Sequence, residues 1–314
     1  MPYRLKEVDR AEITCLVDNA VDVLLATTDV AKRPKIHDWF ERPLIAEHGF
    51  SAAITLEDDD GGRRTLLLDS GLDPFAAAHN VDVLGFDLSD CDLVVSSHGH
   101  VDHAGGLLNI KKKIDPSRQV PLVLHPDAFR NRVMKFPDGR SLPLPAPKRE
   151  LLTDGGYEIL EKGSPTLWMD NRILVTGEVP RTNEFESGNP IHYAEVDGKM
   201  EKDPLIKDDQ AVIIKVKDKG LVVITGCGHS GIINTLNYAK ELSEEDRIYA
   251  VMGGMHLSGG IFESIIPRTV EELTKMKPAV LIPCHCTGLK ATIQMELSMA
   301  NAFIQNSVGT TYTL

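Results

Sequence analysis

The 314-residue sequence lacks any long apolar run and contains only five cysteines. No run approaches the roughly 20 residues that a helix needs to cross a bilayer, so we expect no membrane span. An odd number of cysteines without regular spacing argues against a disulfide-stapled secreted domain and favours a reducing compartment. Residues 1–9 carry charges and no apolar segment of the kind found in signal peptides. We therefore expect a cytoplasmic protein.

Basic residues are also in the minority, with 34 Lys and Arg against 46 Asp and Glu and a formal net charge of -12. An acidic surface disfavours nucleic acid and anionic membranes as partners. The short run Lys111 to Lys113 is more typical of a solvated helix face than of a nucleic-acid-binding patch. We expect a small-molecule partner instead, and a homodimer is the common default for assembly.

Short apolar runs, bounded by polar or turn residues, recur along the chain and predict β-strands. The predicted strands are Glu12–Val17, Ser51–Glu57, Thr65–Asp69, Asp92–Ser96, Pro121–His125, Ala211–Lys217, Leu221–Thr225, Ile248–Met252 and Val280–Pro283. The predicted helices are Leu107–Lys113, a helix that Pro126 and Asp127 begin, Thr269–Met276 and Lys290–Ile304. Two batches of strands with interspersed helices predict an α+β protein, an αββα sandwich of two sheets covered by helices.

The middle of the chain interrupts this pattern. Phe136–Lys148 contains four prolines, which predicts an extended or irregular segment and excludes a helix. Pro180–Asp209 is polar, is punctuated by Gly and Pro, and has no clear period. Because the strand pattern resumes afterwards, we predict one domain over residues 1–314 with an insertion at about 130–210. This insertion could cap a pocket and set its specificity, although its residues do not name a substrate.

The motif with the clearest chemistry directly follows the predicted strand Asp92–Ser96. His98, His100, Asp102 and His103 lie within six consecutive residues. Imidazole and carboxylate groups are good ligands for divalent metal ions. One ion cannot easily use all four donors from so short a stretch, but two adjacent ions can if alternate residues point to opposite sides of a tight loop. We therefore predict that His98 and His100 serve one ion and Asp102 and His103 the other; an accidental histidine-rich loop is the alternative.

Two ions need further ligands, and other strand ends supply candidates. His229 and His285 each follow a predicted strand in the way that His98 does, so we predict both as metal ligands. His256 repeats this arrangement but exceeds the expected number of ligands, and we assign it a catalytic or substrate-binding role. His125 also ends a predicted strand and is a candidate for substrate binding. A structural histidine is the alternative in each case.

Cysteines lie beside two of these histidines. A Cys227 thiolate next to two cations could bind or bridge them, whereas a small buried cysteine is the ordinary alternative. Cys284 and Cys286 flank His285, but this spacing is not that of a structural zinc knuckle, so we expect them to pack in the core. Four histidines occupy positions that predict no role: His37, His48, His79 and His192.

The cluster at residues 98–103 matches the His-x-His-x-Asp-His signature of the metallo-β-lactamase superfamily, and this resemblance implies that superfamily's fold of two mixed sheets flanked by helices. Leu66–Gly71 resembles an upstream strand of the same superfamily, in which Asp69 would support the site through hydrogen bonds to a ligand. Six further segments resemble one branch, the archaeal-type 7,8-dihydropterin-6-methyl-4-(β-D-ribofuranosyl)aminobenzene-5'-phosphate synthase-like proteins. They are ITCLVDN (13–19), AEHGF (46–50), TGEVPR (176–181), TGCGHSGI (225–232), GGMHL (253–257) and PCHCTG (283–288).

One position departs from the wider superfamily, in which a strand commonly ends in Gly-Asp and the aspartate bridges the two ions. Here the corresponding strand ends in Gly226-Cys227. Cys227 could take the place of the aspartate, or a hydroxide alone could bridge the ions. Glu178 is a weaker candidate for the missing carboxylate.

The expected cofactors are two divalent ions, most consistent with Zn, with Fe or Mn as alternatives. Two such ions lower the pKa of a shared water enough to supply hydroxide near neutral pH. We therefore expect a hydrolase that attacks a phosphodiester or a related sulfate ester, phosphotriester or lactone. Asp102 would orient the hydroxide and His256 would assist the oxyanion or the leaving group. Helix starts near Gly105 and Ser230 would offer backbone amides to an anionic substrate.

Two other functions remain open from the sequence. The resemblance to the synthase-like branch implies a transferase reaction that joins a pterin pyrophosphate to an aminobenzene ribosyl phosphate. A metal-binding regulator without turnover is the third possibility, which the intact ligand set disfavours.

Overall fold

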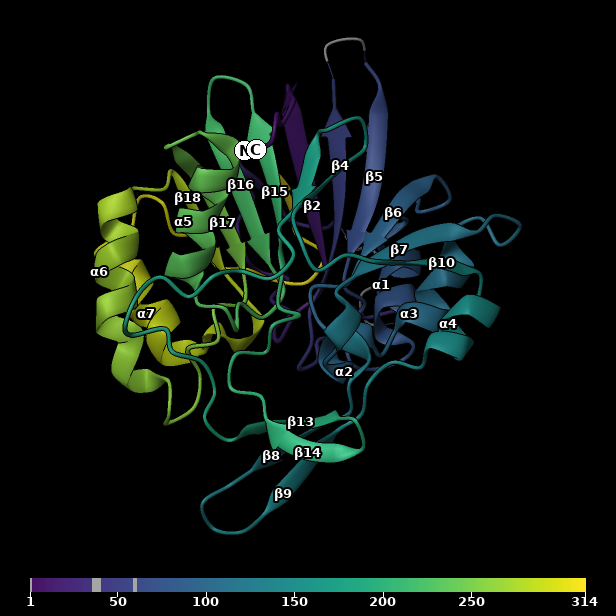
Figure 1. Cartoon of the computed structure of the whole chain (residues 1–314). Helices are drawn as coiled ribbons and strands as arrows, with labels where there is room; N and C mark the ends of the chain where they lie inside the picture. The colour runs from purple at the N-terminus through teal and green to yellow at the C-terminus, as the bar shows by residue number, and fades with distance from the viewer. Residues whose placement is uncertain (1, 36–40, 59–60) are drawn as a thin grey trace.

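The computed structural model describes residues 2–35, 41–58 and 61–314. Two large β-sheets pack face to face, and helices cover the outer side of each sheet (Figure 1). The predicted four-layer αββα sandwich is therefore confirmed. Within the described residues, no helix is long and apolar enough to cross a membrane.

The first sheet has eight strands and combines parallel with antiparallel pairing. In spatial order they are β10 (Tyr157–Glu161), β7 (Val120–Leu124), β6 (Cys91–Val95), β5 (Arg63–Leu68), β4 (Ser51–Glu57), β2 (Arg10–Val17), β19 (Thr311–Thr313) and β3 (Ala31–Lys32). Strands β10, β7, β6 and β5 run parallel, so their carboxyl ends lie at one edge of the sheet.

The second sheet has seven strands and is also mixed. In spatial order they are β11 (Thr166–Trp168), β12 (Ile173–Val175), β15 (Ala211–Val216), β16 (Gly220–Thr225), β17 (Ile248–Gly253) and β18 (Val280–Pro283), with β1 (Glu7–Val8) paired to β15. Every residue of β16 is buried, because the facing sheet covers one side and helices cover the other. This explains why its sequence is a continuous apolar run instead of an alternating one.

Helices pack on the outer faces through their apolar sides. On the seven-stranded sheet lie α5 (Ile232–Ser243), α6 (Ile266–Met276) and α7 (Leu289–Ser298), which bury Leu236, Leu273 and Met295. On the eight-stranded sheet lie α1 (Ala76–Leu84), α3 (Leu107–Ile110) and α4 (Arg149–Asp154), which bury Val81, Ile110 and Leu152. A third apolar cluster fills the space between the sheets. The remaining short elements are α2 (Val101–Ala104), η1 (Lys111–Lys113), η2 (Pro126–Phe129), η3 (Glu263–Ile265) and η4 (His285–Thr287).

A small antiparallel sheet projects from the sandwich (Figure 1). Its strands, in spatial order, are β14 (Lys199–Lys202), β13 (His192–Val196), β8 (Arg132–Lys135) and β9 (Ser141–Leu144). The two segments expected to be extended or irregular thus contain strands that the sequence analysis does not predict. The reason is that β8 and β13 pair across nearly 60 residues, with Met134 opposite His192. The chain between these strand pairs returns to the two large sheets as β10, β11 and β12.

All nine predicted strands are present, with ends shifted by at most two residues. Two helix predictions are wrong in extent. The helix expected to reach Ile304 ends at Ser298, because the following backbone bonds to β18 instead: the Leu281 amide donates to Ala302 and the Ile304 amide donates to Leu281. The helix expected at Pro126 is the single turn η2, after which the chain extends into β8.

The loop that leaves β6 packs closely against the loop that follows β7. A Cβ atom on Gly99 would lie 2.0 Å from the backbone oxygen of Ala128. We therefore predict that Gly99→Ala lowers the free energy of unfolding by about 1–3 kcal/mol, because the backbone must move to admit the methyl group. Urea denaturation would measure this change. Gly260→Ala is the matched control, since no atom lies within 4 Å of its added Cβ; equal stability of the two variants would contradict the prediction.

Candidate metal centre

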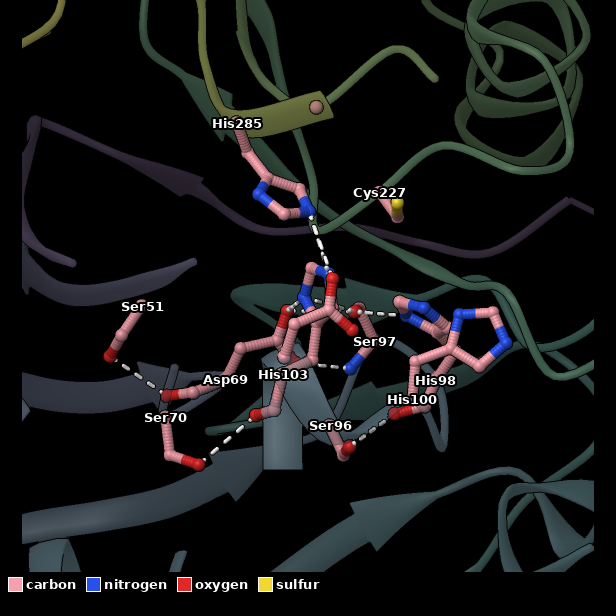
Figure 2. A network of polar contacts seen from close by, with 12 residues as sticks. Ser51, Asp69, Ser70, Ser96, Ser97, His98, His100, His103, Cys227 and His285 are labelled. Carbon is pink, nitrogen blue, oxygen red and sulfur yellow. Dashed lines mark hydrogen bonds and ion pairs between the residues drawn. The ribbon is translucent and has the colours of Figure 1, made fainter. Parts of the chain in front are cut away.

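Loops at the ends of four strands converge between the two sheets. The loop after β6 carries His98, His100, Asp102 and His103, and the loops after β16, β17 and β18 carry His229, His256 and His285. In Figure 2, His285 and Cys227 lie across the site from His98, His100 and His103. All six residues that the sequence predicts as metal ligands are therefore brought together, in two groups.

The first group consists of three buried imidazoles. His229 Nε2 lies 3.2 Å from His98 Nε2 and 3.2 Å from His100 Nδ1. The three donor atoms all lie within 4.8 Å of one another. The other nitrogen of His98 lies 2.9 Å from the Ser97 hydroxyl, which fixes the orientation of the ring. The first group thus combines two imidazoles from a loop of the eight-stranded sheet with one imidazole from a loop of the seven-stranded sheet.

The second group combines one carboxylate with two imidazoles. Asp102 Oδ2 lies 3.4 Å from His285 Nε2 and 3.7 Å from His103 Nε2. The two imidazole nitrogens are themselves 3.2 Å apart. The second group differs from the first in its charge, since Asp102 supplies the only carboxylate among the six predicted ligands. This arrangement is compatible with the predicted pairing of His98 with His100 and of Asp102 with His103, which stays a prediction because His98 and His103 also lie in one cluster with Cys227.

Asp69 holds the loop after β6 in place. Its carboxylate accepts hydrogen bonds from the Ser97 amide and hydroxyl, each at 2.7 Å, and lies 2.7 Å from His103 Nδ1 (Figure 2). The expectation that Asp69 supports a ligand through a hydrogen bond agrees with this contact. Gly226 passes directly over the pair, because a Cβ there would lie 2.0 Å from the Ser97 hydroxyl oxygen and 2.4 Å from Asp69 Oδ2. A glycine is therefore required where β16 leaves its sheet.

The first group consists of neutral side chains, whereas the second group contains charged ones. Burial, together with neighbouring imidazoles, holds the pKa of His98, His100 and His229 well below the ordinary value, so these rings are neutral. Burial also opposes the charge on His103, but the carboxylates of Asp69 and Asp102 outweigh it and raise the pKa of His103 to about 9. For Asp102, burial favours the neutral acid, yet His103 and a hydrogen bond from His285 hold its pKa well below the usual range.

These donors fit divalent metal ions. Each ring nitrogen of a neutral imidazole is either a donor or an acceptor, so at least one of the facing nitrogens of His98, His100 and His229 carries no hydrogen and offers a lone pair. The Nδ1 of His229 is buried and has no hydrogen-bond partner within the described residues. Three neutral nitrogens facing one point, beside a group with one carboxylate, form a donor set of the kind that zinc and similar ions accept.

A second layer of contacts supports His100, and the sequence analysis missed it. His192 of β13 places its Nε2 3.0 Å from His100 Nε2. Nearby, Arg132 of β8 binds both Asp203 and Asp208, and Asp208 accepts a hydrogen bond of 2.8 Å from the Gly99 amide. The small sheet is thus tied to the ligand loop by a buried polar network. No sequence signal identifies His192, because its position depends on the long-range pairing of β13 with β8.

His285 is positioned by the amino-terminal part of the chain. Its amide donates to Asp18 Oδ1 at 2.7 Å, and its carbonyl accepts from Asn19 Nδ2 at 3.0 Å. His285 adopts a positive φ of 48°, and Asp69 and His256 do so as well, at 58° and 46°. Such backbone strain in non-glycine residues costs on the order of 1 kcal/mol and is concentrated at functional sites. Asp18 and Asn19 belong to a segment that carried the branch resemblance, but their role was not predicted.

A cavity of about 240 Å³ opens beside the two groups. It is lined by polar residues of the site, including His256, and by aliphatic side chains of the small sheet, including Met134, Leu142 and Leu144. His48 also lines it, with Nε2 3.9 Å from Asp102 Oδ2. The expected location of His256 beside the ligands is thus observed, whereas His48 was not predicted.

The structure separates the cysteines of the site from those of the core. Cys227 lines the cavity, with Sγ 3.5 Å from His256 Nδ1. The prediction that Cys286 packs in the core is wrong, because its side chain lines the same cavity, 3.0 Å from the Cys227 sulfur. Cys284 does pack in the core between the sheets, because the chain turns at His285 (φ 48°) into η4 and so directs Cys286 to a different side.

Two candidates from the sequence are not brought to this cavity. His125 Nδ1 accepts the Asp127 amide at 3.1 Å and thereby caps the turn η2, and His125 is absent from the described lining. Glu178 is exposed and pairs with Lys207 at 3.4 Å. Of the remaining histidines, His79 contacts the Pro43 carbonyl at 2.8 Å, and His37 lies outside the described residues.

The expectation that helix starts offer amides to a substrate is wrong. The Ser230 amide donates to Asp209 at 2.8 Å, and the carboxylate of Glu186 accepts the amides of Ile233 and Asn234 at the start of α5. The Gly105 amide bonds to backbone carbonyls. Internal acceptors therefore satisfy the donors that an anion would need.

Comparison with known proteins identifies the class. The family model described as the metallo-beta-lactamase superfamily matches residues 48–242, which is more than half of the chain. The protein therefore belongs to the metallo-β-lactamase superfamily, as the signature at residues 98–103 predicts. Members of this superfamily typically bind divalent metal ions, and the chain holds candidate groups for them.

Particular relatives agree with the predicted branch. An uncharacterised protein of Methanocaldococcus jannaschii is 34% identical over 269 residues, which cover 85% of this chain and 94% of the relative. The 7,8-dihydropterin-6-methyl-4-(β-D-ribofuranosyl)-aminobenzene-5'-phosphate synthase of the same organism is 28% identical, over 80% of this chain and 85% of its own. A crystal structure of a metal-dependent hydrolase of the β-lactamase superfamily has a TM-score of 0.72 and 25% identity, covering 97% of this chain and 98% of the other.

The raised pKa of His103 leads to a prediction about metal uptake. At pH 7, below a pKa of about 9, this imidazole is protonated in the metal-free protein. A metal ion binds only the neutral ring, so uptake at this position should release about one proton, and its affinity should rise about tenfold per pH unit below pH 9. Calorimetric titration with Zn²⁺ in two buffers of different ionisation enthalpy would count the protons.

Asp69→Asn is the informative variant for this experiment, because Asp69 is the larger of the two carboxylate influences that raise the pKa of His103, the other being Asp102. We expect it to release fewer protons at pH 7 than the wild-type protein and to bind metal about 10–100-fold more weakly. An unchanged proton count in Asp69→Asn would show that His103 does not exchange its proton for the metal.

Proposed function

We propose that this protein is a metal-dependent hydrolase that uses two divalent ions, most consistent with Zn²⁺, to cleave a small anionic ester such as a phosphodiester. The observation that carries the proposal is the convergence of two donor groups at one cavity, His98 with His100 and His229, and Asp102 with His103 and His285. Paired metal sites of this kind suit displacement reactions at phosphorus, sulfur or carbonyl centres.

The cavity walls favour a particular kind of ester. Within the described residues, the lining contains no lysine or arginine, so the protein itself supplies no cationic side chain to an anionic group. The negative charge of the substrate would therefore lie against the metal groups. The aliphatic side chains of Leu72, Met134, Leu142 and Leu144 form the apolar part of the lining. We infer a substrate with a compact anionic head and an apolar or aromatic arm.

The residues of the site can divide the chemistry between them. When bound, two divalent ions would supply Lewis acidity, lowering the pKa of a water molecule and neutralising the anionic ester. Asp102 is ionised and half-buried, so its carboxylate can accept a hydrogen bond from the attacking water and orient it. The buried Nε2 of His256 has no hydrogen-bond partner within the described residues. His256 also lines the cavity, so its imidazole is available to an oxygen of a bound substrate. His256 would stabilise charge on the leaving group.

A second candidate function is the synthase reaction of the 28% identical relative. One structural observation favours it: a further cavity of about 190 Å³ shares His229 and His256 with the first and is otherwise lined by residues such as Phe185, Met255 and Phe262. Joining a pterin pyrophosphate to an aminobenzene ribosyl phosphate needs two compartments beside one reacting centre. Incubation with both substrates and detection of the joined product would support this reaction; an absence of product from protein that hydrolyses esters would exclude it.

Ligand variants test the proposed hydrolase. We expect His100→Ala and Asp102→Ala each to lose bound metal and to lower hydrolysis of an activated phosphodiester by more than roughly 100-fold, since even partners of metal ligands contribute 10–100-fold. Metal content by plasma mass spectrometry and initial rates would be measured together. His79→Ala is the control, because His79 is only half-buried, contacts the Pro43 carbonyl, and does not line the cavity in the described part of the chain.

A panel of activated phosphodiesters, phosphotriesters, sulfate esters and lactones defines the ester class. Fully metal-loaded protein that is inert toward the whole panel would overturn the hydrolase proposal. Retention of two equivalents of metal by both ligand variants would show instead that the ligands have been assigned wrongly.

A further inference from the structure

Two cysteines from distant parts of the chain meet at the metal centre. Cys227 follows β16 and Cys286 lies in η4 after β18, 59 residues apart, yet their sulfur atoms are 3.0 Å from each other. The Cys286 thiol also lies 3.1 Å from the Cys227 carbonyl oxygen, to which it can donate. Both thiols are free. No covalent bond joins the two loops, but their sulfurs are already closer than the usual contact distance between unbonded atoms of this size.

The surroundings make this pair reachable by small polar molecules. Both side chains line the cavity of about 240 Å³, although little of either is exposed to bulk solvent. The Cys227 sulfur lies within 4.8 Å of donor atoms of His98 and His103, one from each metal group, and the pair forms a similar cluster with His285. Any reagent or ion that enters the metal centre therefore meets the dithiol.

The other three cysteines have a different environment. Cys15 and Cys284 pack between the sheets, and Cys91 packs beneath the helices of the eight-stranded sheet. Each thiol has a backbone carbonyl within its own strand region as hydrogen-bond partner, at 3.6, 3.3 and 3.3 Å. None of them lines the cavity in the described part of the chain. These three cysteines are therefore internal controls for any reaction of thiols in the cavity.

We propose that Cys227 and Cys286 form a redox-active dithiol, which a hydroperoxide such as H₂O₂ oxidises to a disulfide and which bound metal protects. In the first step one thiol cleaves the O–O bond, becoming a sulfenic acid and releasing one water. In the second step the partner thiol attacks the oxidised sulfur and forms the S–S bond with loss of a second water. Two thiols and one H₂O₂ thus give one disulfide and two waters, with both electrons passing to the peroxide.

The geometry also predicts a coupling between oxidation and metal. A disulfide needs the sulfurs to approach to about 2.05 Å, so the side chains at the ends of the loops after β16 and β18 must shift until the sulfurs are about 1 Å closer. These loops carry His229 and His285, one ligand candidate from each group. A divalent ion beside the sulfurs attracts thiolate as a ligand and withdraws it from attack on the peroxide. Metal-loaded protein should therefore oxidise more slowly than metal-free protein.

Peptide mapping of the wild-type protein tests this inference. Metal-free and Zn²⁺-loaded protein would be treated with H₂O₂, quenched with an alkylating reagent in denaturant, digested and analysed by mass spectrometry. We expect one disulfide between Cys227 and Cys286 in the metal-free protein, leaving the other three cysteines free. Its formation should be more than about tenfold slower after metal loading.

Cysteine variants provide the matched comparison. Cys286→Ser should abolish the disulfide, whereas Cys284→Ser, two residues away but directed into the core, should leave it unchanged. A disulfide that joins another pair, its absence in the wild-type protein, or an equal rate with and without Zn²⁺ would overturn the proposal. The readout is a mapped bond in the wild-type chain, so its failure is distinguishable from a failure of the proposed ester hydrolysis.

Discussion

The organisation of this protein depends on the carboxylate of Asp69. It is fully buried and accepts hydrogen bonds from the Ser97 amide and hydroxyl, and it lies against His103. Through Ser97 it also reaches His98, so one acid orients a donor in each group. Burying a carboxylate costs free energy unless its oxygens accept hydrogen bonds. Here the partners are Ser97 and His103, so the same contacts also fix the orientation of the donor residues. The same contact explains the glycine at position 226, where the facing sheet comes closest.

The site is assembled from both sheets and from the small sheet that projects beyond them. The two large sheets bring the loops after β6, β16 and β18 to one place, and the small sheet adds the aliphatic wall and His192. Arg132, buried between Asp203 and Asp208, joins this wall to the ligand loop through the Gly99 amide. The small sheet thereby contributes both to the lining of the cavity and to the orientation of His100.

Cys227 stands where the corresponding strand of the superfamily commonly ends in an aspartate. This difference bears on redox chemistry as well as on metal binding. A carboxylate is redox-inert, whereas two thiols 3.0 Å apart can exchange electrons as well as bind soft ions. Placed between the two donor groups, the pair makes the chemistry of the centre sensitive to both metal supply and oxidants. Both thiols line the cavity at the donor groups, so the proposed oxidation and the proposed ester hydrolysis would take place in one cavity.

Nine strands and the cluster of His98, His100, Asp102 and His103 could be predicted from the amino-acid sequence, because strand periodicity and residue spacing are short-range properties. The sequence also located His229, His256 and His285, since a strand end is recognisable from its apolar run. The folded chain was needed to show which side chains meet. His192 and Cys286 reach the site through contacts between distant segments, and His125 turns away to cap η2. Glu186 likewise occupies the start of α5 that an anion could have used. Contacts between residues tens of positions apart follow from packing, which no local pattern encodes.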